Sequence, residues 1–138
     1  MINLMIGKKG SGKTKRLVNY ANEKISKSDG NVVVIEKGSN LTFDLDHNAR
    51  LINIDNYGIS DFAGLYGFLC GICAGNYDVT DILIDSTLKI CGEDIHKLIP
   101  FMDRLNVVCK NTNTNLVLSV SMDESELPAE IKNIVNIL

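Results

Sequence analysis

The stretch that decides the fold is Gly7-Lys8-Lys9-Gly10-Ser11-Gly12-Lys13-Thr14, which matches the pattern G-x-x-x-x-G-K-[ST] in full. A short apolar run at residues 2–6 precedes it and suits a buried strand. Residues 13–27, which overlap its end, carry apolar side chains at helical spacing. The complete pattern between a strand and a helix predicts a phosphate-binding loop that includes all eight residues.

Each residue type in this loop has a physical role toward phosphate. Glycines let the backbone curl so that successive N–H groups point at the phosphate oxygens, and the helix beginning at Lys13 adds the positive end of its dipole. Lys13 is expected to reach the β- and γ-phosphates, and the Thr14 hydroxyl is expected to ligate Mg²⁺. Lys8 and Lys9 add charge, and we interpret them as solvated side chains of the binding loop. The loop therefore predicts binding of a nucleoside triphosphate together with Mg²⁺.

Strands and helices alternate along the rest of the chain. Apolar, β-branched runs predict strands at residues 31–36, 50–55, 81–86 and 115–121, and helical spacing predicts helices at residues 59–75 and 95–110. This alternation indicates a parallel sheet with both faces covered. We expect an α/β protein with a three-layer α/β/α P-loop NTPase fold and a mainly parallel sheet of about five strands. The length of 138 residues suits a single nucleotide-binding domain over residues 1–138.

Composition and charge indicate which kinds of partner and which cell compartment to expect. The net charge of −3 provides no general basic field, and the segment at residues 122–126 is acidic, so the sequence argues against nucleic-acid binding. No apolar run approaches the roughly 18 residues that a membrane span needs, so no membrane insertion is expected. Cys70, Cys73, Cys91 and Cys109 occur without a secretory signal, which predicts reduced thiols and a cytoplasmic protein. Because Cys70 and Cys73 fall late in a predicted helix, we interpret that pair as ordinary buried thiols.

The predicted helix at residues 59–75 is unusually rich in glycine. It contains Gly64, Gly67, Gly71 and Gly75, and each costs up to about 1 kcal/mol relative to alanine in a helix interior. Close backbone approach to another element would offset this cost. We expect that element to be the sheet, with another subunit as the alternative. Pro100 similarly predicts that the helix at residues 95–110 starts late or kinks in its first turns.

A second acidic position completes the predicted site. Asp85 ends the apolar strand run Ile82-Leu83-Ile84, as expected for the carboxylate that holds the Mg²⁺ water shell beside Thr14. Asp55 ends another strand run and competes for this role.

With these residues in this order, the sequence resembles the RecA-like branch of P-loop ATPases, including the KaiC-type proteins. The phosphate loop precedes a buried strand ending in Glu36, and the strand ending in Asp85 precedes one ending in small polar residues. The resemblance implies that Glu36 activates the attacking water and that Ser121, or Ser119, senses the γ-phosphate. Together with Lys13, these are the predicted catalytic residues of an ATPase using ATP with Mg²⁺. Relatives often form rings or filaments, which implies a homo-oligomer or another protein as partner.

A non-hydrolysing protein is a second hypothesis. Arg16, Arg50 and Arg104 are the only arginines, and none lies in a motif, so no arginine finger can be assigned. The hydrolytic machinery is then incomplete, or a neighbouring subunit completes it. Without turnover the chain would act as a nucleotide-dependent switch or assembly module. The two hypotheses differ in whether Glu36 has a catalytic role. The ATPase hypothesis therefore predicts that Glu36→Gln keeps ATP binding and suppresses hydrolysis.

A GTPase is the third hypothesis. The stretch Asp55-Asn56-Tyr57-Gly58 matches D-x-x-G, the γ-phosphate switch of that class. Guanine-specific enzymes also carry N-K-x-D after a later strand, and the matching stretch here, Val120-Ser121-Met122-Asp123, keeps only the Asp. D-x-x-G alone is ordinary turn chemistry, so ATP is favoured over GTP. A small-molecule kinase would need an acceptor pocket and a lid, for which 138 residues leave little room.

Overall fold

The computed structural model describes residues 2–42 and 44–138, whose strands form one six-stranded parallel sheet. The sheet order is β3-β2-β4-β5-β1-β6. The elements in chain order are β1 (Ile2–Gly7), α1 (Lys13–Lys27), β2 (Asn31–Glu36), β3 (Arg50–Asn53), η1 (Ile54–Tyr57), α2 (Phe62–Gly75), β4 (Val79–Ile84), α3 (Thr87–Cys91), α4 (Ile95–Thr112), β5 (Asn115–Ser121), η2 (Glu124–Glu126), α5 (Ala129–Lys132) and β6 (Asn136–Ile137).

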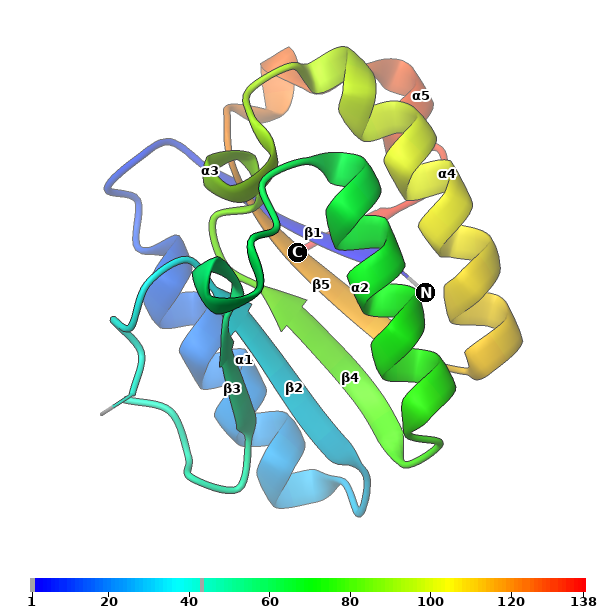
Figure 1. Cartoon of the computed structure of the whole chain (residues 1–138). Coiled ribbons are helices and arrows are strands. Elements are labelled where there is room, and N and C mark those ends of the chain that lie inside the picture. Colours follow the sequence, from blue (N-terminus) through cyan, green and yellow to red (C-terminus); the bar gives the residue numbers. More distant parts are fainter. Residues whose placement is uncertain (1, 43) are drawn as a thin grey trace.

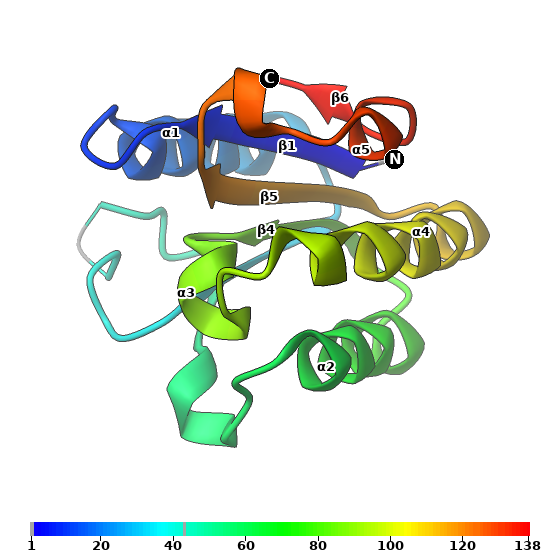
Figure 2. The same cartoon turned by 90° about the horizontal axis from the view of Figure 1, so that it is seen from above.

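Helices cover both faces of this sheet (Figure 1). Helix α1 packs on one face, where Leu17 and Val18 meet Val32, Val34 and the other residues of the smaller core. Helices α2 and α4 lie together on the opposite face, which Figure 2 shows from above with α3 on the same side. The strands are continuous apolar runs because successive side chains point into two different cores. The predicted three-layer α/β/α P-loop fold is therefore confirmed, with six strands in place of about five.

Local hydrogen bonds explain where the predicted boundaries differ. Strand β3 stops at Asn53, two residues earlier than expected, because the Asn53 side chain accepts the Asp55 N–H and begins the 3-10 helix η1. Helix α4 begins at Ile95 with Pro100 inside it, so it does not start late, and the alternative, a kink in its first turns, stays a prediction. The Asp94 side chain caps its first turn. Helix α3 and strand β6 were not predicted, since elements of two to five residues leave little periodicity to detect.

The glycines of α2 do not make the expected close approach to the sheet. A Cβ atom built on Gly67, Gly71 or Gly75 meets nothing within 4 Å, and one on Gly64 meets the Asp61 side chain that caps the helix. The contacts of α2 with the core come instead from its apolar face, which includes Leu65. The expectation that these glycines pack on the sheet is therefore wrong. The alternative, packing against another subunit, stays a prediction.

Alanine at these positions is expected to stabilise the isolated chain. Gly67→Ala and Gly71→Ala should each raise the free energy of unfolding by about 0.5–1 kcal/mol and the melting temperature by about 2–4 °C, because alanine costs less chain entropy in a helix and has room here. Gly30→Ala should have the opposite effect and destabilise the protein, because its Cβ would collide with the Thr80 side chain. Thermal unfolding measures all three changes. Destabilisation by Gly67→Ala would contradict the open surroundings of this helix face.

Candidate nucleotide-binding site

The carboxyl ends of the parallel strands bring the predicted site residues to one edge of the sheet. Gly7 ends β1, Glu36 ends β2, Asp85 follows β4 and Ser121 ends β5. Strand β5 lies between β1 and β4, and its register pairs Ser121 with Gly7. The Asp85 N–H donates to the Ile35 carbonyl at 2.9 Å, which ties the start of the next loop to β2. Residues separated by more than 100 positions therefore converge on the phosphate loop.

The loop has the backbone conformation that anion binding requires. Gly10 and Gly12 adopt φ values of 83° and 86°, which side-chain-bearing residues rarely adopt, so glycine is needed at both. The Ser11 N–H donates to the Lys8 carbonyl at 3.0 Å and closes the turn. Gly12 is the N-cap of α1 and offers no side-chain cap, so the first N–H groups of the helix stay available to a ligand.

Lys13 is the buried cation of the loop. Its residue is only 7% exposed, and its Nζ donates to the Lys8 carbonyl at 3.0 Å. Burial lowers the pKa of Lys13 from its ordinary 10.5, with Asp85 opposing the shift and Lys89 and Arg16 adding to it. A partly desolvated ammonium with one neutral acceptor gains from a phosphate oxygen, because an opposite charge favours its charged form.

Thr14 and Asp85 lie together beside Lys13. The Thr14 hydroxyl donates to both Asp85 carboxylate oxygens, at 3.2 and 3.4 Å. A hydroxyl and a carboxylate are hard oxygen ligands, and Mg²⁺ typically takes one or two such protein groups and fills its shell with water and phosphate oxygens. The donor set therefore fits Mg²⁺ bound with a nucleotide. Asp55, the competing carboxylate, instead forms an ion pair with Lys37 at 2.9 Å.

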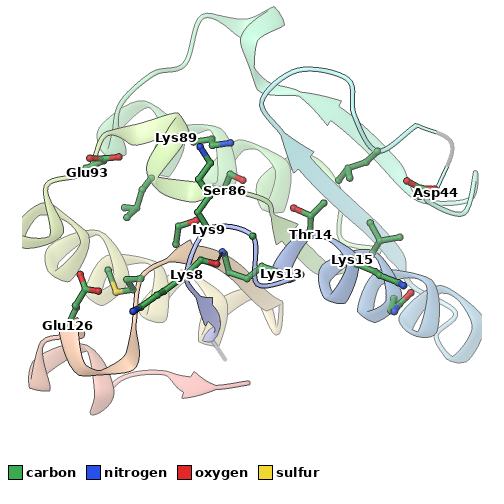
Figure 3. A pocket seen from close by; sticks show the side chains of 18 of the residues that line it. Lys8, Lys9, Lys13, Thr14, Lys15, Asp44, Ser86, Lys89, Glu93 and Glu126 are labelled. Atoms are coloured by element: carbon green, nitrogen blue, oxygen red, sulfur yellow. Dashed lines mark hydrogen bonds between the residues drawn. The ribbon is translucent and has the colours of Figure 1, made fainter.

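Two adjoining cavities surround these groups. The larger, of about 1290 Å³, runs along the phosphate loop between Asp44 at one end and Glu93 and Glu126 at the other (Figure 3). The smaller, of about 400 Å³, contains Asp85, Asp55 and Lys37. Three residues line both cavities: Thr14, Ser86 and Lys89.

Sequence reasoning missed several residues of this cavity. Leu41 and Val18 supply apolar lining on one side, and Leu88, Ile95 and Met122 supply it on the other. Only α3, a helix too short to show a periodic pattern, brings Leu88 and Lys89 to the site. The one signal that could have found Lys89 is its position four residues after Asp85.

The Glu36 carboxylate is buried and held by backbone N–H groups. The residue is 2% exposed, lines neither cavity, and its carboxylate accepts the backbone N–H groups of Asn40 at 2.8 Å and Leu41 at 3.3 Å. Since Leu41 lines the larger cavity and Asn40 the smaller, these bonds fix the loop that forms part of the wall. In this arrangement both carboxylate oxygens are engaged by the protein's own backbone.

The two serines of β5 have different surroundings. Ser121 is exposed and lines the larger cavity next to the loop. Ser119 is 1% exposed, and its hydroxyl has no hydrogen-bond partner among the described residues. Of the two positions proposed for γ-phosphate sensing, only Ser121 can reach a ligand without rearrangement of the sheet.

The four cysteines are free thiols; Cys73 is buried as expected, whereas Cys70 is only partly buried. Lys8 and Lys9 are exposed and line the larger cavity, and the Lys8 ammonium lies 3.9 Å from the Asp123 carboxylate. Within residues 2–42 and 44–138, no group of three or more His, Cys, Asp or Glu residues is placed to hold a metal ion. Over the same residues, no helix has the length and apolar character needed to span a bilayer.

Comparison with known proteins identifies the fold. No protein-family model and no curated protein sequence matches this chain. The structure is similar to that of PCH-2 from C. elegans, with a TM-score of 0.58 and 16% sequence identity. The match covers 99% of this chain and 34% of the PCH-2 chain, so this chain spans about a third of that protein's length. The likeness supports the P-loop fold and does not extend to the RecA-like branch.

Proposed function

We propose that this chain is a Mg²⁺-dependent ATP-binding module that acts as a nucleotide-dependent switch, with slow or negligible hydrolysis. The observation that carries the proposal is the buried Lys13 ammonium inside a glycine-shaped loop, beside the Thr14–Asp85 pair. The loop N–H groups and Lys13 would hold the phosphates, and Thr14 and Asp85 would hold the Mg²⁺. When bound, Mg²⁺ would neutralise part of the charge on the phosphate oxygens.

The position of Glu36 favours the switch over the hydrolase. A water-activating carboxylate must lie within hydrogen-bond reach of a water in the site. Both Glu36 oxygens accept backbone N–H groups instead, and the side chain is buried. Release of these bonds would leave the buried Leu41 N–H unpaired, at a cost of about 1–3 kcal/mol. The switch would then act on its partner, another protein or a second copy of this chain, through the loop that Glu36 holds.

A RecA-like ATPase is the second candidate. It is supported by Ser121, which lines the cavity beside the loop at the end of β5, and by Glu36 at the end of the strand next to β4. In that case the Glu36 carboxylate must leave the loop when nucleotide binds, and a neighbouring subunit can supply further charge.

Calorimetric titration followed by a phosphate-release assay tests the proposal. We expect wild-type protein to bind Mg-ATP, to prefer it over Mg-GTP, and to release phosphate at a rate close to the protein-free background. Glu36→Gln should leave ATP binding within about threefold, because the side chain does not line the cavity. Absence of ATP binding, or a tenfold preference for GTP, would overturn the proposal. Phosphate release that Glu36→Gln abolishes would replace the switch with the RecA-like ATPase.

A further inference from the structure

Lys89 lies where the two cavities meet. It is exposed at the surface of the protein and lines both cavities, together with Thr14 and Ser86. The larger cavity contains Lys13, and the smaller contains Asp85. The junction therefore lies between the cation expected to hold the β- and γ-phosphates and the carboxylate expected to hold Mg²⁺. The outermost phosphate of a triphosphate held by Lys13 and by Mg²⁺ on Asp85 would lie in this region.

The backbone after β4 is shaped to bring Lys89 there. Ser86 adopts φ 54° and ψ 54°, a left-handed conformation that costs a non-glycine residue about 1–3 kcal/mol. This turn starts α3 immediately after Asp85, and the Lys89 N–H donates to the Ser86 carbonyl at 2.9 Å. Figure 3 shows Lys89 on α3, on the same side of the phosphate loop as Ser86. Strain of this kind persists where the surrounding structure holds it, and functional sites are a common location.

Of the lysines that line the larger cavity, Lys89 alone also lines the smaller one. Five residues give the larger cavity its positive charge, Lys8, Lys9, Lys13, Lys15 and Lys89, and no arginine is among its lining residues. The Arg16 guanidinium donates to the Leu138 carbonyl, and that of Arg104 stacks 3.8 Å from the Tyr66 ring centroid. In the smaller cavity, Lys37 is paired with Asp55. Among the described residues, no salt bridge occupies Lys89.

We propose that Lys89 binds the terminal phosphate of the nucleoside triphosphate, and so makes the site discriminate triphosphate from diphosphate. Lys89 would supply from the same chain the positive charge for which no arginine is available. The inference rests on the proposed nucleotide-binding function and names the residue that senses the state of the nucleotide. A diphosphate held by the loop and Lys13 would leave the junction to water.

The test compares two nucleotides in variants of the full chain. Dissociation constants of Mg-ATPγS and Mg-ADP are measured by calorimetry for wild type, Lys89→Met, Lys89→Arg and Lys97→Met. Lys97 is the matched control, because it is an exposed lysine on α4 that lines neither cavity. We expect Lys89→Met to weaken Mg-ATPγS about tenfold or more, as for a lost charge-assisted contact, and Mg-ADP less than threefold. Lys89→Arg should keep most of the discrimination, and Lys97→Met should match wild type.

The outcomes separate this inference from the proposed function. Wild-type protein that binds neither nucleotide overturns both. Normal binding by wild type, with equal losses for the two nucleotides in Lys89→Met or no loss at all, overturns the role of Lys89 and leaves the nucleotide site in place. Because Lys89 is exposed, a folding defect is not expected, and unchanged circular dichroism of each variant checks this.

Discussion

Lys13→Met is expected to abolish nucleotide binding and, at the same time, to stabilise the protein without ligand. The ammonium is the buried positive charge of the phosphate loop, and its hydrogen-bond partner in the structure is a neutral carbonyl. Hydrogen bonds to charged groups contribute about 1.5–3 kcal/mol each, and Lys13 is expected to make at least one to each of two phosphates. Loss of affinity by about 100-fold or more should therefore appear in an ATP titration.

The stabilisation follows from the lowered pKa of Lys13. A lysine whose pKa is lower in the folded state binds fewer protons there than in the unfolded chain, so its charge opposes folding at neutral pH. The penalty is fully present below the folded-state pKa and disappears as the pH rises past 10.5. We expect Lys13→Met to melt at a higher temperature than wild type at pH 7, and the difference to shrink as the pH approaches 10.5.

Lys15→Met provides the control for both effects. Lys15 also lines the larger cavity, but it is exposed, so its removal should change neither the apo melting temperature nor the order of magnitude of ATP affinity. If Lys13→Met bound ATP as tightly as wild type, the loop would not be the phosphate site. A lower melting temperature for Lys13→Met would contradict the burial penalty.

Asp85→Asn is expected to remove the Mg²⁺ dependence of ATP binding. The Asp85 carboxylate and the Thr14 hydroxyl are adjacent hard oxygen donors in the structure, and loss of a group that holds or orients a metal typically weakens binding 10- to 100-fold. In the presence of Mg²⁺ the variant should therefore bind ATP about 10- to 100-fold more weakly than wild type. In EDTA the two proteins should bind ATP similarly, because phosphate contacts of the loop do not involve Asp85.

Asp55→Asn distinguishes a specific metal site from a general effect of negative charge. Asp55 lines the same smaller cavity, but its carboxylate is paired with Lys37. The affinity difference between Mg²⁺ and EDTA should therefore persist in Asp55→Asn. Loss of the Mg²⁺ dependence in Asp55→Asn, with its retention in Asp85→Asn, would assign the metal to Asp55 instead.

The phosphate loop and the layers of the fold could be predicted from the sequence, because the first is a local pattern and the second follows from the spacing of apolar residues. Two glycines at positive φ, a lysine and a threonine follow one another within the loop itself. The runs around β2, β4 and β5 are apolar on both sides because helices cover both faces, so their pattern already implied a parallel sheet. The expectation that the glycines of α2 pack on the sheet is wrong, because composition alone does not tell which face of a helix is left open.

What the sequence by itself determined is therefore the loop and the order of the elements, since each depends on neighbours along the chain. Tertiary structure alone decided how the strand-end side chains are used. In the folded chain the Glu36 carboxylate accepts hydrogen bonds from the N–H groups of Asn40 and Leu41, and Lys89 lies at the junction of the two cavities. These outcomes depend on how a loop folds back and on one left-handed residue before α3. Neither leaves a repeating pattern in the sequence, because each is fixed by contacts between segments that only the packed sheet brings together.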